Sequence, residues 1–198
     1  MAPWKGKNAL TGLLSLIERL PLAECGQVKA VRALNRLMPH GDWYGEALGI
    51  KMSDEESGEL TLAFSMLDIS GKSLEGEFDS RCPICATKEN TIDVIREKME
   101  ADGISFNTEE MKSPHHVPAD SDFVKTLLSA YEKYSGRKGE CIAIGGGTYV
   151  HNLKNGVAFG AALPETENHM HGPDEFAVVD ELTMSAKIFA QVIVDLCC

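Results

Sequence analysis

The fold is decided by the stretch LTLAFSMLDISGKSLEGEFDSRCPI, residues 60–84. Residues 60–69 and 74–84 each mix apolar and polar positions in the pattern of half-buried β-strands. The tetrapeptide Ser70-Gly71-Lys72-Ser73 separates them, and glycine is well suited to a tight turn. The stretch therefore predicts a β-hairpin with its turn at Gly71.

Helical patterns lie on both sides of this hairpin. Apolar residues recur three and four positions apart over residues 8–20 and 27–38, which predicts two amphipathic helices before it. After it, residues 91–101 predict a third helix and residues 104–111 another strand. The order of these elements favours an open-faced α/β sandwich with an antiparallel sheet, an α+β layer over residues 1–113.

A domain boundary is predicted at residues 113–119, where two prolines bracket a short linker. Beyond it, residues 120–134 and 180–196 have helical patterns, and residues 141–144 and 157–163 have strand patterns. Strands that alternate with helices are typical of an α/β unit. We therefore expect two domains, residues 1–113 and residues 114–198.

The charge balance restricts the classes of partner. Lys and Arg total 19 against 30 for Asp and Glu, giving a net charge of −11. Such a chain repels phosphate, so the composition argues against binding nucleic acid or an anionic membrane. No apolar run approaches the ~20 residues of a membrane helix, and the first residues do not resemble a secretory signal. We expect a cytoplasmic protein.

The six cysteines include the pair Cys82 and Cys85 in a CxxC motif. A structural zinc site would need a second pair at suitable spacing, and the sequence has no second CxxC. A redox motif would lie where a strand enters a helix, whereas this pair follows a strand pattern directly. Structural thiols are favoured, and a redox or metal-sensing role is the alternative.

Three further features have the residue types of a binding site. The run Gly145-Gly146-Gly147-Thr148 lies between a strand pattern and a helix start, where backbone N–H groups can bind a carboxylate or another oxyanion. It lacks the ending of a nucleotide P-loop. The simpler interpretation is a tight turn without a ligand.

His169 and His171 lie in an acidic loop, and imidazole beside carboxylates suits zinc. Solvated histidines are the simpler interpretation. Arg81, inside the second strand, is a candidate to bind a carboxylate with two hydrogen bonds, or else a surface arginine that pairs with Asp79 or Glu77.

Four motifs in order carry a resemblance to a known family. They are EFDSRCP at residues 77–83, GGGTY at 145–149, GVAFG at 156–160 and MHGPDEF at 170–176. Together they resemble the carboxyl-terminal half of the dizinc family that includes aminoacylases, carboxypeptidase G and dipeptidase V, the dipeptidase V type above all. The opening segment, residues 3–9, resembles the segment that follows that family's lid histidine.

The resemblance implies a fold and a site. The first domain would be a ferredoxin-like lid, incomplete at its N-terminus, and the second the carboxyl-terminal α/β part of a zinc-peptidase catalytic domain. His171 would be the last zinc ligand, and Arg81 would hold the terminal carboxylate of the substrate. The loop that contacts the same end of the substrate would consist of Gly145, Gly146, Gly147 and Thr148. The residue after the family's arginine is usually aromatic, and here it is Cys82.

The resemblance also implies an activity. The intact enzyme would hydrolyse dipeptides or similarly short peptides with two zinc ions. The other zinc ligands, the bridging aspartate and the glutamate base lie upstream in the family, so no catalytic residue is assigned here and this fragment is expected to be inactive by itself. A non-catalytic lid module that forms a homodimer is the alternative, together with a thiol sensor at Cys82 and Cys85.

Of the two loop histidines, His171 has the Met-His-x-x-x-Glu context of the family. On the assumption of an extended loop, we expect the two histidines to point to opposite sides, with His171 as the metal ligand and His169 directed away from the metal. This expectation depends on the backbone of the loop.

Overall fold

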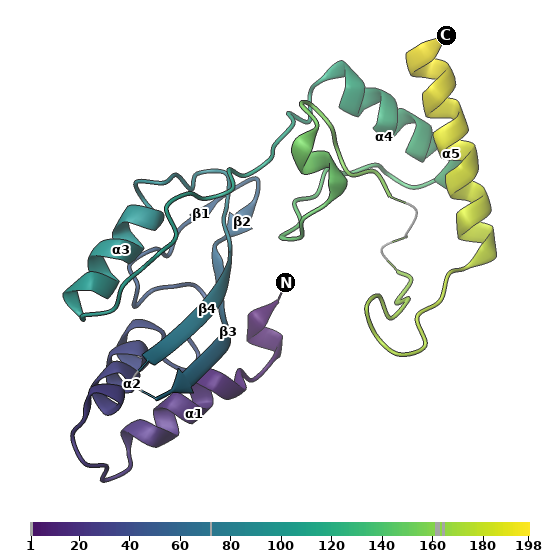
Figure 1. Cartoon of the computed structure of the whole chain (residues 1–198). Coiled ribbons are helices and arrows are strands. Elements are labelled where there is room, and N and C mark those ends of the chain that lie inside the picture. The colour runs from purple at the N-terminus through teal and green to yellow at the C-terminus, as the bar shows by residue number, and fades with distance from the viewer. Residues whose placement is uncertain (1, 72, 161–162, 164) are drawn as a thin grey trace. The chain divides into compact units, whose positions relative to one another are not determined.

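The computed structural model describes residues 2–71, 73–160, 163 and 165–198. The chain divides into two compact units (Figure 1). The first unit runs up to His115 and includes Ala143–Gly146, and the second comprises His116–Ile142 and Gly147–Cys198. Helices and small antiparallel sheets make up the described structure, which confirms the α+β class.

The predicted hairpin is confirmed. Strand β3 (Thr61–Ser70) pairs antiparallel with β4 (Ser73–Arg81), from Ser70 opposite Ser73 at the turn to Thr61 opposite Arg81 at the open end. The register shifts between Phe64 and Met66, which marks a β-bulge at Ser65.

The bulge has a cause in the sequence. The apolar side chains of β3 change phase along the strand, from Leu62 and Phe64 to Leu67 and Ile69. Because successive strand residues point to opposite faces, only one extra residue keeps both sets on the same face.

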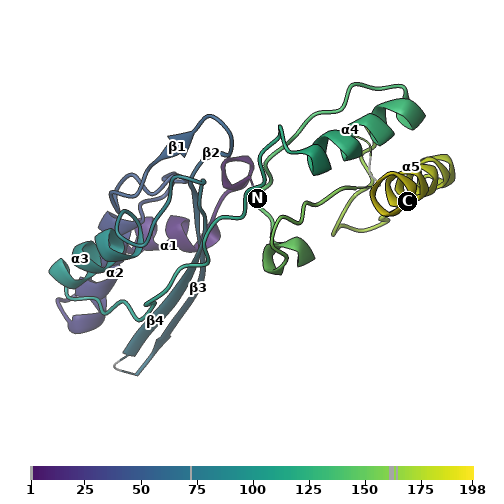
Figure 2. The same cartoon turned by 90° about the horizontal axis from the view of Figure 1, so that it is seen from above.

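The predicted helices of the first unit are also confirmed, as α1 (Ala9–Glu18), α2 (Gly26–Leu37) and α3 (Ile92–Ala101). All three lie on the same side of the hairpin (Figure 2). They bury one continuous core against it, which includes Leu14, Leu34, Leu62, Phe64 and Ile95.

A pair of two-residue strands and one 3₁₀ helix also belong to the first unit. Strands β1 (Ser53–Asp54) and β2 (Gly58–Glu59) form a second antiparallel pair, and the 3₁₀ helix η1 (Pro3–Lys5) packs against β3. The polar stretch around Asp54 thus forms a small hairpin.

The strand predicted over residues 104–111 is wrong, because this segment has no strand assignment. Its contacts come from side chains instead of a ladder. The ring of Phe106 stacks on Phe78 with centroids 6.0 Å apart, and the Arg96 guanidinium donates to the Thr108 carbonyl at 2.7 Å. The Thr108 carbonyl therefore accepts its hydrogen bond from a side chain, whereas in a sheet it would accept one from a neighbouring strand.

In the second unit, α4 (Asp122–Ser135) and α5 (Val179–Cys197) confirm the predicted helices, and η2 (Tyr149–Asn152) is a short 3₁₀ turn. Leu127 and Ala130 of α4 pack against Ile188 and Val192 of α5. Ser121 caps α4, because its side chain accepts a hydrogen bond from the Val124 N–H.

The strands predicted in this part are wrong where the structure describes them. Residues 141–144 form no strand, and neither do 157–160 and 163, while 161 and 162 lie outside the described residues. Ile142 and Ile144 remain 81% and 58% exposed. The apolar pattern was correct, but a strand also needs a partner for its backbone, and the described chain offers none here.

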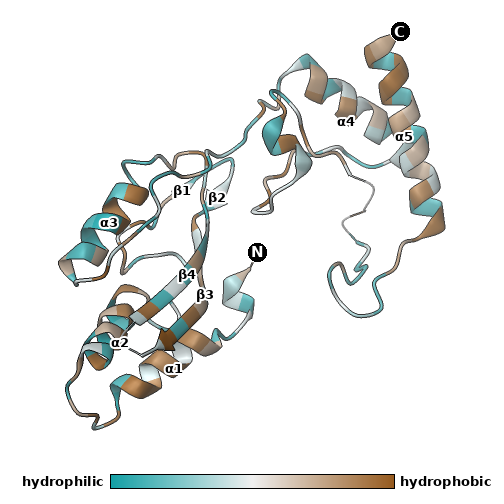
Figure 3. Ribbon diagram, in the orientation of Figure 1, coloured by the Kyte–Doolittle hydropathy of each residue, from teal (hydrophilic) through white to brown (hydrophobic). Residues whose placement is uncertain are grey.

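Apolar residues recur along the whole of α5, beyond the face that packs on α4 (Figure 3). Leu182, Phe189, Ile193 and Leu196 are all large apolar residues with exposures of 40% or more. Within the described residues, no helix is both long and apolar enough to cross a bilayer.

Candidate functional site

Arg81 ends β4 on the face of the hairpin opposite the helices. By strand alternation, Leu62 and Phe64 face the core, while Thr61 and Arg81 share the other face. The Arg81 side chain is half-buried, and its Nε atom is buried without a hydrogen-bond partner among the described residues. The same residues show no ion pair between Arg81 and Asp79 or Glu77. The surface-pairing alternative therefore does not describe this arginine.

The segment that follows Arg81 is fixed by the small β1–β2 hairpin. The Asp54 carboxylate accepts hydrogen bonds from the Ser57 N–H at 2.6 Å, the Ser57 hydroxyl at 2.8 Å and the Cys85 N–H at 3.2 Å. The Ser57 hydroxyl in turn accepts from the Ile84 N–H at 2.8 Å. These bonds hold the turn at residues 83–86, and they lower the pKa of Asp54 to about 2, with the Ser57 N–H as the leading cause.

The same carboxylate affects the Cys85 thiol. Burial raises the pKa of Cys85, and the negative charge of Asp54 raises it further. Redox cysteines need a lowered thiol pKa, since the thiolate is the reactive form. All six cysteines are free thiols in the structure. The environment of Cys85 therefore speaks against the thiol-sensor alternative.

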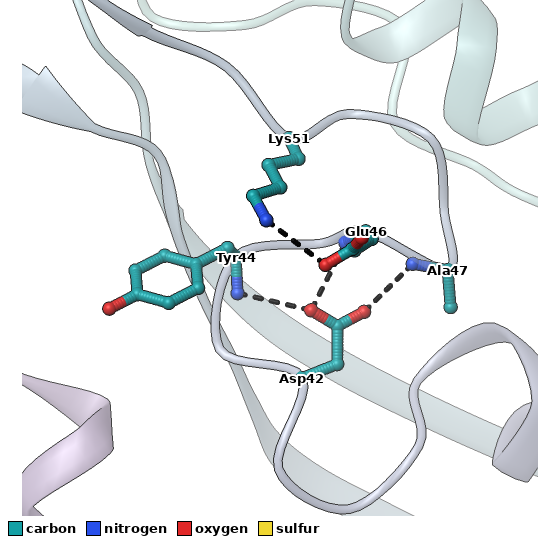
Figure 4. Close-up of polar contacts among 5 residues, drawn as sticks. All are labelled: Asp42, Tyr44, Glu46, Ala47 and Lys51. Carbon is teal, nitrogen blue, oxygen red and sulfur yellow. Dashed lines mark hydrogen bonds and ion pairs between the residues drawn. The ribbon is translucent and has the colours of Figure 1, made fainter.

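The start of β3 is held by the loop between α2 and β1 (Figure 4). The Asp42 carboxylate accepts from the backbone N–H groups of Tyr44, Glu46 and Ala47 at 3.2, 3.0 and 2.8 Å. The loop then joins the strand, because the Leu62 N–H donates to the Trp43 carbonyl at 2.7 Å. It thus fixes the residue next to Thr61.

Glycine is required inside this loop. Gly45 has a φ of +69°, and a Cβ atom there would lie 2.5 Å from the Ile50 Cγ1 atom. Any side chain would be strained in conformation and would displace a fully buried isoleucine. The ion pair between Lys51 Nζ and Glu46 Oε2, at 3.1 Å, closes the exposed edge of the loop.

The glycine run precedes η2. Gly145 and Gly146 belong to the first unit, whereas Gly147 and Thr148 belong to the second. The Thr148 N–H lies 3.2 Å from the His151 Nδ1 atom, which orders the start of the 3₁₀ turn. A Cβ atom at Gly146 or Gly147 would meet no atom within 4 Å, and neither residue has a positive φ. The described structure thus gives no internal reason for glycine at these two positions.

His171 and His169 lie in a loop that closes on itself. The Phe176 N–H donates to the Asn168 carbonyl at 3.2 Å, and the Gly172 N–H donates to the His169 carbonyl at 2.7 Å. Both histidines are exposed, and the His169 ring contacts the Phe176 ring edge-on at 5.8 Å between centroids. The two imidazoles therefore differ in this ring contact and not in their exposure to solvent.

The expectation of an extended loop is wrong. His169 and His171 have φ values of 58° and 63°, and Asp174 has 58°, so all three adopt the left-handed conformation. The expectation that the two histidines point to opposite sides of an extended loop is therefore wrong, and residues two apart in an extended segment would in any case share a face. The contact between His169 and Phe176 separates their environments instead.

The fit to a metal ion is partial. Among the described residues, no three His, Cys, Asp or Glu side chains come together as a metal-binding group. An exposed imidazole such as His171 can supply one zinc ligand. A complete zinc site would need further ligands, so we derive no reaction step through the metal.

Sequence reasoning missed two residues around Arg81, namely Thr61 and Asp54. The signal for Thr61 was present, because the phase change in the apolar pattern of β3 reveals the bulge that brings Thr61 opposite Arg81. Counting back from the turn without the bulge would place Cys82 there. Asp54 gave no signal, because its partner Cys85 is 31 positions away.

Known proteins resemble this chain over nearly its whole length. A protein of Bacillus subtilis (strain 168) named "Putative dipeptidase YtjP" is 37% identical over 199 residues, which cover 99% of this chain and 42% of the relative. A Beta-Ala-Xaa dipeptidase of Lactobacillus delbrueckii subsp. lactis is 33% identical over 98% of this chain and 41% of its own length.

The chain thus spans less than half the length of these curated relatives. The family described as Peptidase family M20/M25/M40 matches residues 11–195. Since this match covers most of the sequence, the chain belongs to peptidase family M20/M25/M40.

Proposed function

We propose that this chain is part of a zinc-dependent dipeptidase that hydrolyses short peptides. Residues 1–113 would form a ferredoxin-like lid domain, and residues 114–198 the carboxyl-terminal part of the catalytic domain. The names of two relatives, both dipeptidases, support the substrate class. The single observation that carries the proposal is the state of Arg81.

Arg81 would bind the terminal carboxylate of the substrate. Its Nε atom is buried without a hydrogen-bond partner among the described residues, and these residues show no ion pair between Arg81 and the neighbouring Asp79 or Glu77. A guanidinium without an ion pair keeps its terminal N–H donors for a ligand, and a carboxylate matches two of them at once. Holding the carboxylate orients the scissile bond, which contributes to catalysis by positioning.

The loop Gly145–Gly146–Gly147–Thr148 would contact the same end of the substrate. Gly146 and Gly147 have no internal need for glycine, since a side chain would meet open space at either position. Glycine also allows a ligand to approach the backbone closely, and that would explain glycine at positions where the described residues make no close contact. This supports a binding role over a simple tight turn.

His171 would be one zinc ligand of the intact site. Both loop histidines are exposed, but the His169 ring also packs on Phe176, and His171 has the Met-His-x-x-x-Glu context. Zinc bound there would supply Lewis acidity toward a carbonyl and would lower the pKa of a water ligand. The remaining ligands and the general base would come from the portion of the relatives that this chain does not span, so we expect no dipeptide hydrolysis by these 198 residues alone.

The experiment is Arg81→Ala in a longer enzyme that contains these residues, assayed with a dipeptide and with the same dipeptide as its C-terminal amide. Loss of a desolvated charge partner should cost about 2–5 kcal/mol in kcat/KM for the free dipeptide. The amide substrate has no carboxylate, so Arg81→Ala and the wild type should hydrolyse it at nearly the same rate.

Arg96→Ala is the matched control, because Arg96 is half-buried but pairs with Asp93 of α3 and donates to the Thr108 carbonyl beyond that helix. It should affect both substrates alike. A change in kcat/KM of less than about threefold for Arg81→Ala with the dipeptide would refute the proposed role.

A further inference from the structure

Thr61 is a buried polar residue without a partner. Its side chain is only 7% exposed, and its hydroxyl oxygen makes no hydrogen bond among the described residues. Buried hydroxyls are nearly always hydrogen-bonded, because leaving one unpaired is unfavourable. Valine has the same shape and would fill this position without that cost. The hydroxyl therefore needs a reason beyond packing.

The residue opposite Thr61 has the complementary defect. Thr61 and Arg81 form the first rung of the β3–β4 ladder, and the Arg81 Nε atom is likewise buried and unpartnered. Directly opposed residues in an antiparallel pair have Cβ atoms about 4.5–5.5 Å apart. A threonine hydroxyl can accept a hydrogen bond, and an arginine Nε–H can only donate one. The two groups are thus within reach of each other.

Both ends of this rung are held in place. The Leu62 N–H bonds to the Trp43 carbonyl of the Asp42 loop, which fixes the backbone beside Thr61. On the other strand, Asp54 and Ser57 bind the turn that follows Arg81. Because the two backbones are held, an approach of the hydroxyl to Nε would come from the side-chain rotamers of Thr61 and Arg81.

We propose that Thr61 is a positioning residue for Arg81: its hydroxyl accepts the Nε–H and presents the terminal guanidinium nitrogens to a bound carboxylate. The proposal rests on the proposed role of Arg81. With Nε held by Thr61, rotation of the guanidinium is restricted, and its outer nitrogens remain free for the ligand. Thr61 itself need not touch the ligand.

The test uses the full 198-residue chain and NMR of the Arg81 Nε–H signal, assigned with Arg81→Lys. The probe is L-alanyl-L-alanine, and L-alanyl-L-alaninamide is the control ligand without a carboxylate. In the wild type we expect a saturable shift with the free dipeptide and none with the amide.

Thr61→Val, which keeps the shape and removes the hydroxyl, should weaken this response by roughly tenfold in Kd. Thr61→Ser, which keeps the hydroxyl, should remain within about twofold of the wild type. If Thr61→Val does not fold by circular dichroism, Thr61→Ala takes its place as the variant without a hydroxyl.

The outcomes separate the two proposals. An equal response of the wild type and the variant without a hydroxyl would overturn the role of Thr61 and leave that of Arg81 intact. Equal loss in Thr61→Ser and Thr61→Val would also overturn it, because packing would then be the cause. A wild type that does not distinguish the dipeptide from its amide would overturn both roles.

Discussion

At the scale of single residues, the ionised Asp54 carboxylate is stabilised by hydrogen bonds that exist in the folded chain. Hydrogen bonds from Ser57 and Cys85 hold its pKa at about 2, below its usual 3.8. Because the folded state binds this proton less readily than the unfolded chain, the stabilisation is present above about pH 4 and is lost as the pH falls toward 2. Asp54→Asn should therefore lower the Tm at pH 7 and flatten its decline between about pH 4 and pH 2.

The measurement is thermal unfolding by circular dichroism across this pH range. Asp68→Asn is the control, since Asp68 is an exposed carboxylate on β3, in the other sheet of the same unit. It should leave the acid limb of the curve unchanged. If the Tm of Asp54→Asn and that of the wild type fall in parallel as the pH is lowered, the hydrogen bonds to the Asp54 carboxylate do not contribute to stability.

The two loop histidines differ at the same scale. Both are exposed, but His169 contacts Phe176 and His171 has the sequence context of the family's ligand. Substitution of His171 in the longer enzyme should therefore remove about one equivalent of zinc, and substitution of His169 should not. Asparagine is the best replacement in both, because it tolerates the left-handed backbone that both residues adopt. The measurement is the zinc content of each purified variant by atomic absorption. Equal loss of zinc from both variants would indicate a site with two histidine ligands.

At the scale of elements, the two faces of α5 should respond differently to truncation. Ile188 is 4% exposed in the contact with α4, and Ile193, five residues later, is 61% exposed. Ile188→Ala should lower the free energy of unfolding by about 2–5 kcal/mol, because it leaves a cavity. Ile193→Ala should stay within about 0.5 kcal/mol of the wild type.

Urea unfolding followed by circular dichroism compares the two variants. Since both replace isoleucine by alanine in one helix, their difference removes the effect of helix propensity. A similar loss in both would mean that the exposed face of α5 is covered in solution.

The elements also show what the sequence could and could not predict. The five helices and the β3–β4 hairpin follow from local periodicity, and all were predicted. The strands at residues 104–111 and 141–144 were not formed, since a strand depends on a distant partner that periodicity does not reveal. The pairing of Thr61 with Arg81 was missed for a different reason, because one bulged residue at Ser65 shifts the count.

The candidate site shows the same division. Arg81, the glycine run and His171 were chosen from the resemblance, and their roles remain predictions. Local chemistry could suggest their residue types but not their surroundings. The contact of His169 with Phe176 and the clamp of Asp54 on Cys85 join residues that only the folded chain brings together.

At the scale of the whole molecule, the chain forms two compact units and spans 42% of the length of the Bacillus subtilis relative. One exposed histidine cannot hold two metal ions at the ~3.5–4 Å separation of a two-metal site. We therefore expect the purified chain, incubated with zinc, cobalt or manganese and a panel of dipeptides, to release no free amine above background. Metal-dependent turnover that disappears in His171→Ala would contradict this and would require a complete site within these residues.

The bulge in β3 has a consequence for how this segment tolerates changes in length. Without Ser65, Phe64 and Met66 become neighbours on a regular strand, every apolar side chain keeps its face, and Thr61 stays opposite Arg81. Without Asp68, the residues on one side of the gap change faces, and Leu62 and Phe64 turn away from the core. A chain lacking Ser65 should thus melt within a few degrees of the wild type, whereas one lacking Asp68 should not. During evolution, the gene can therefore lose a single codon at the bulge, whereas elsewhere in the strand a deletion would have to remove two codons to keep the apolar side chains on the same face.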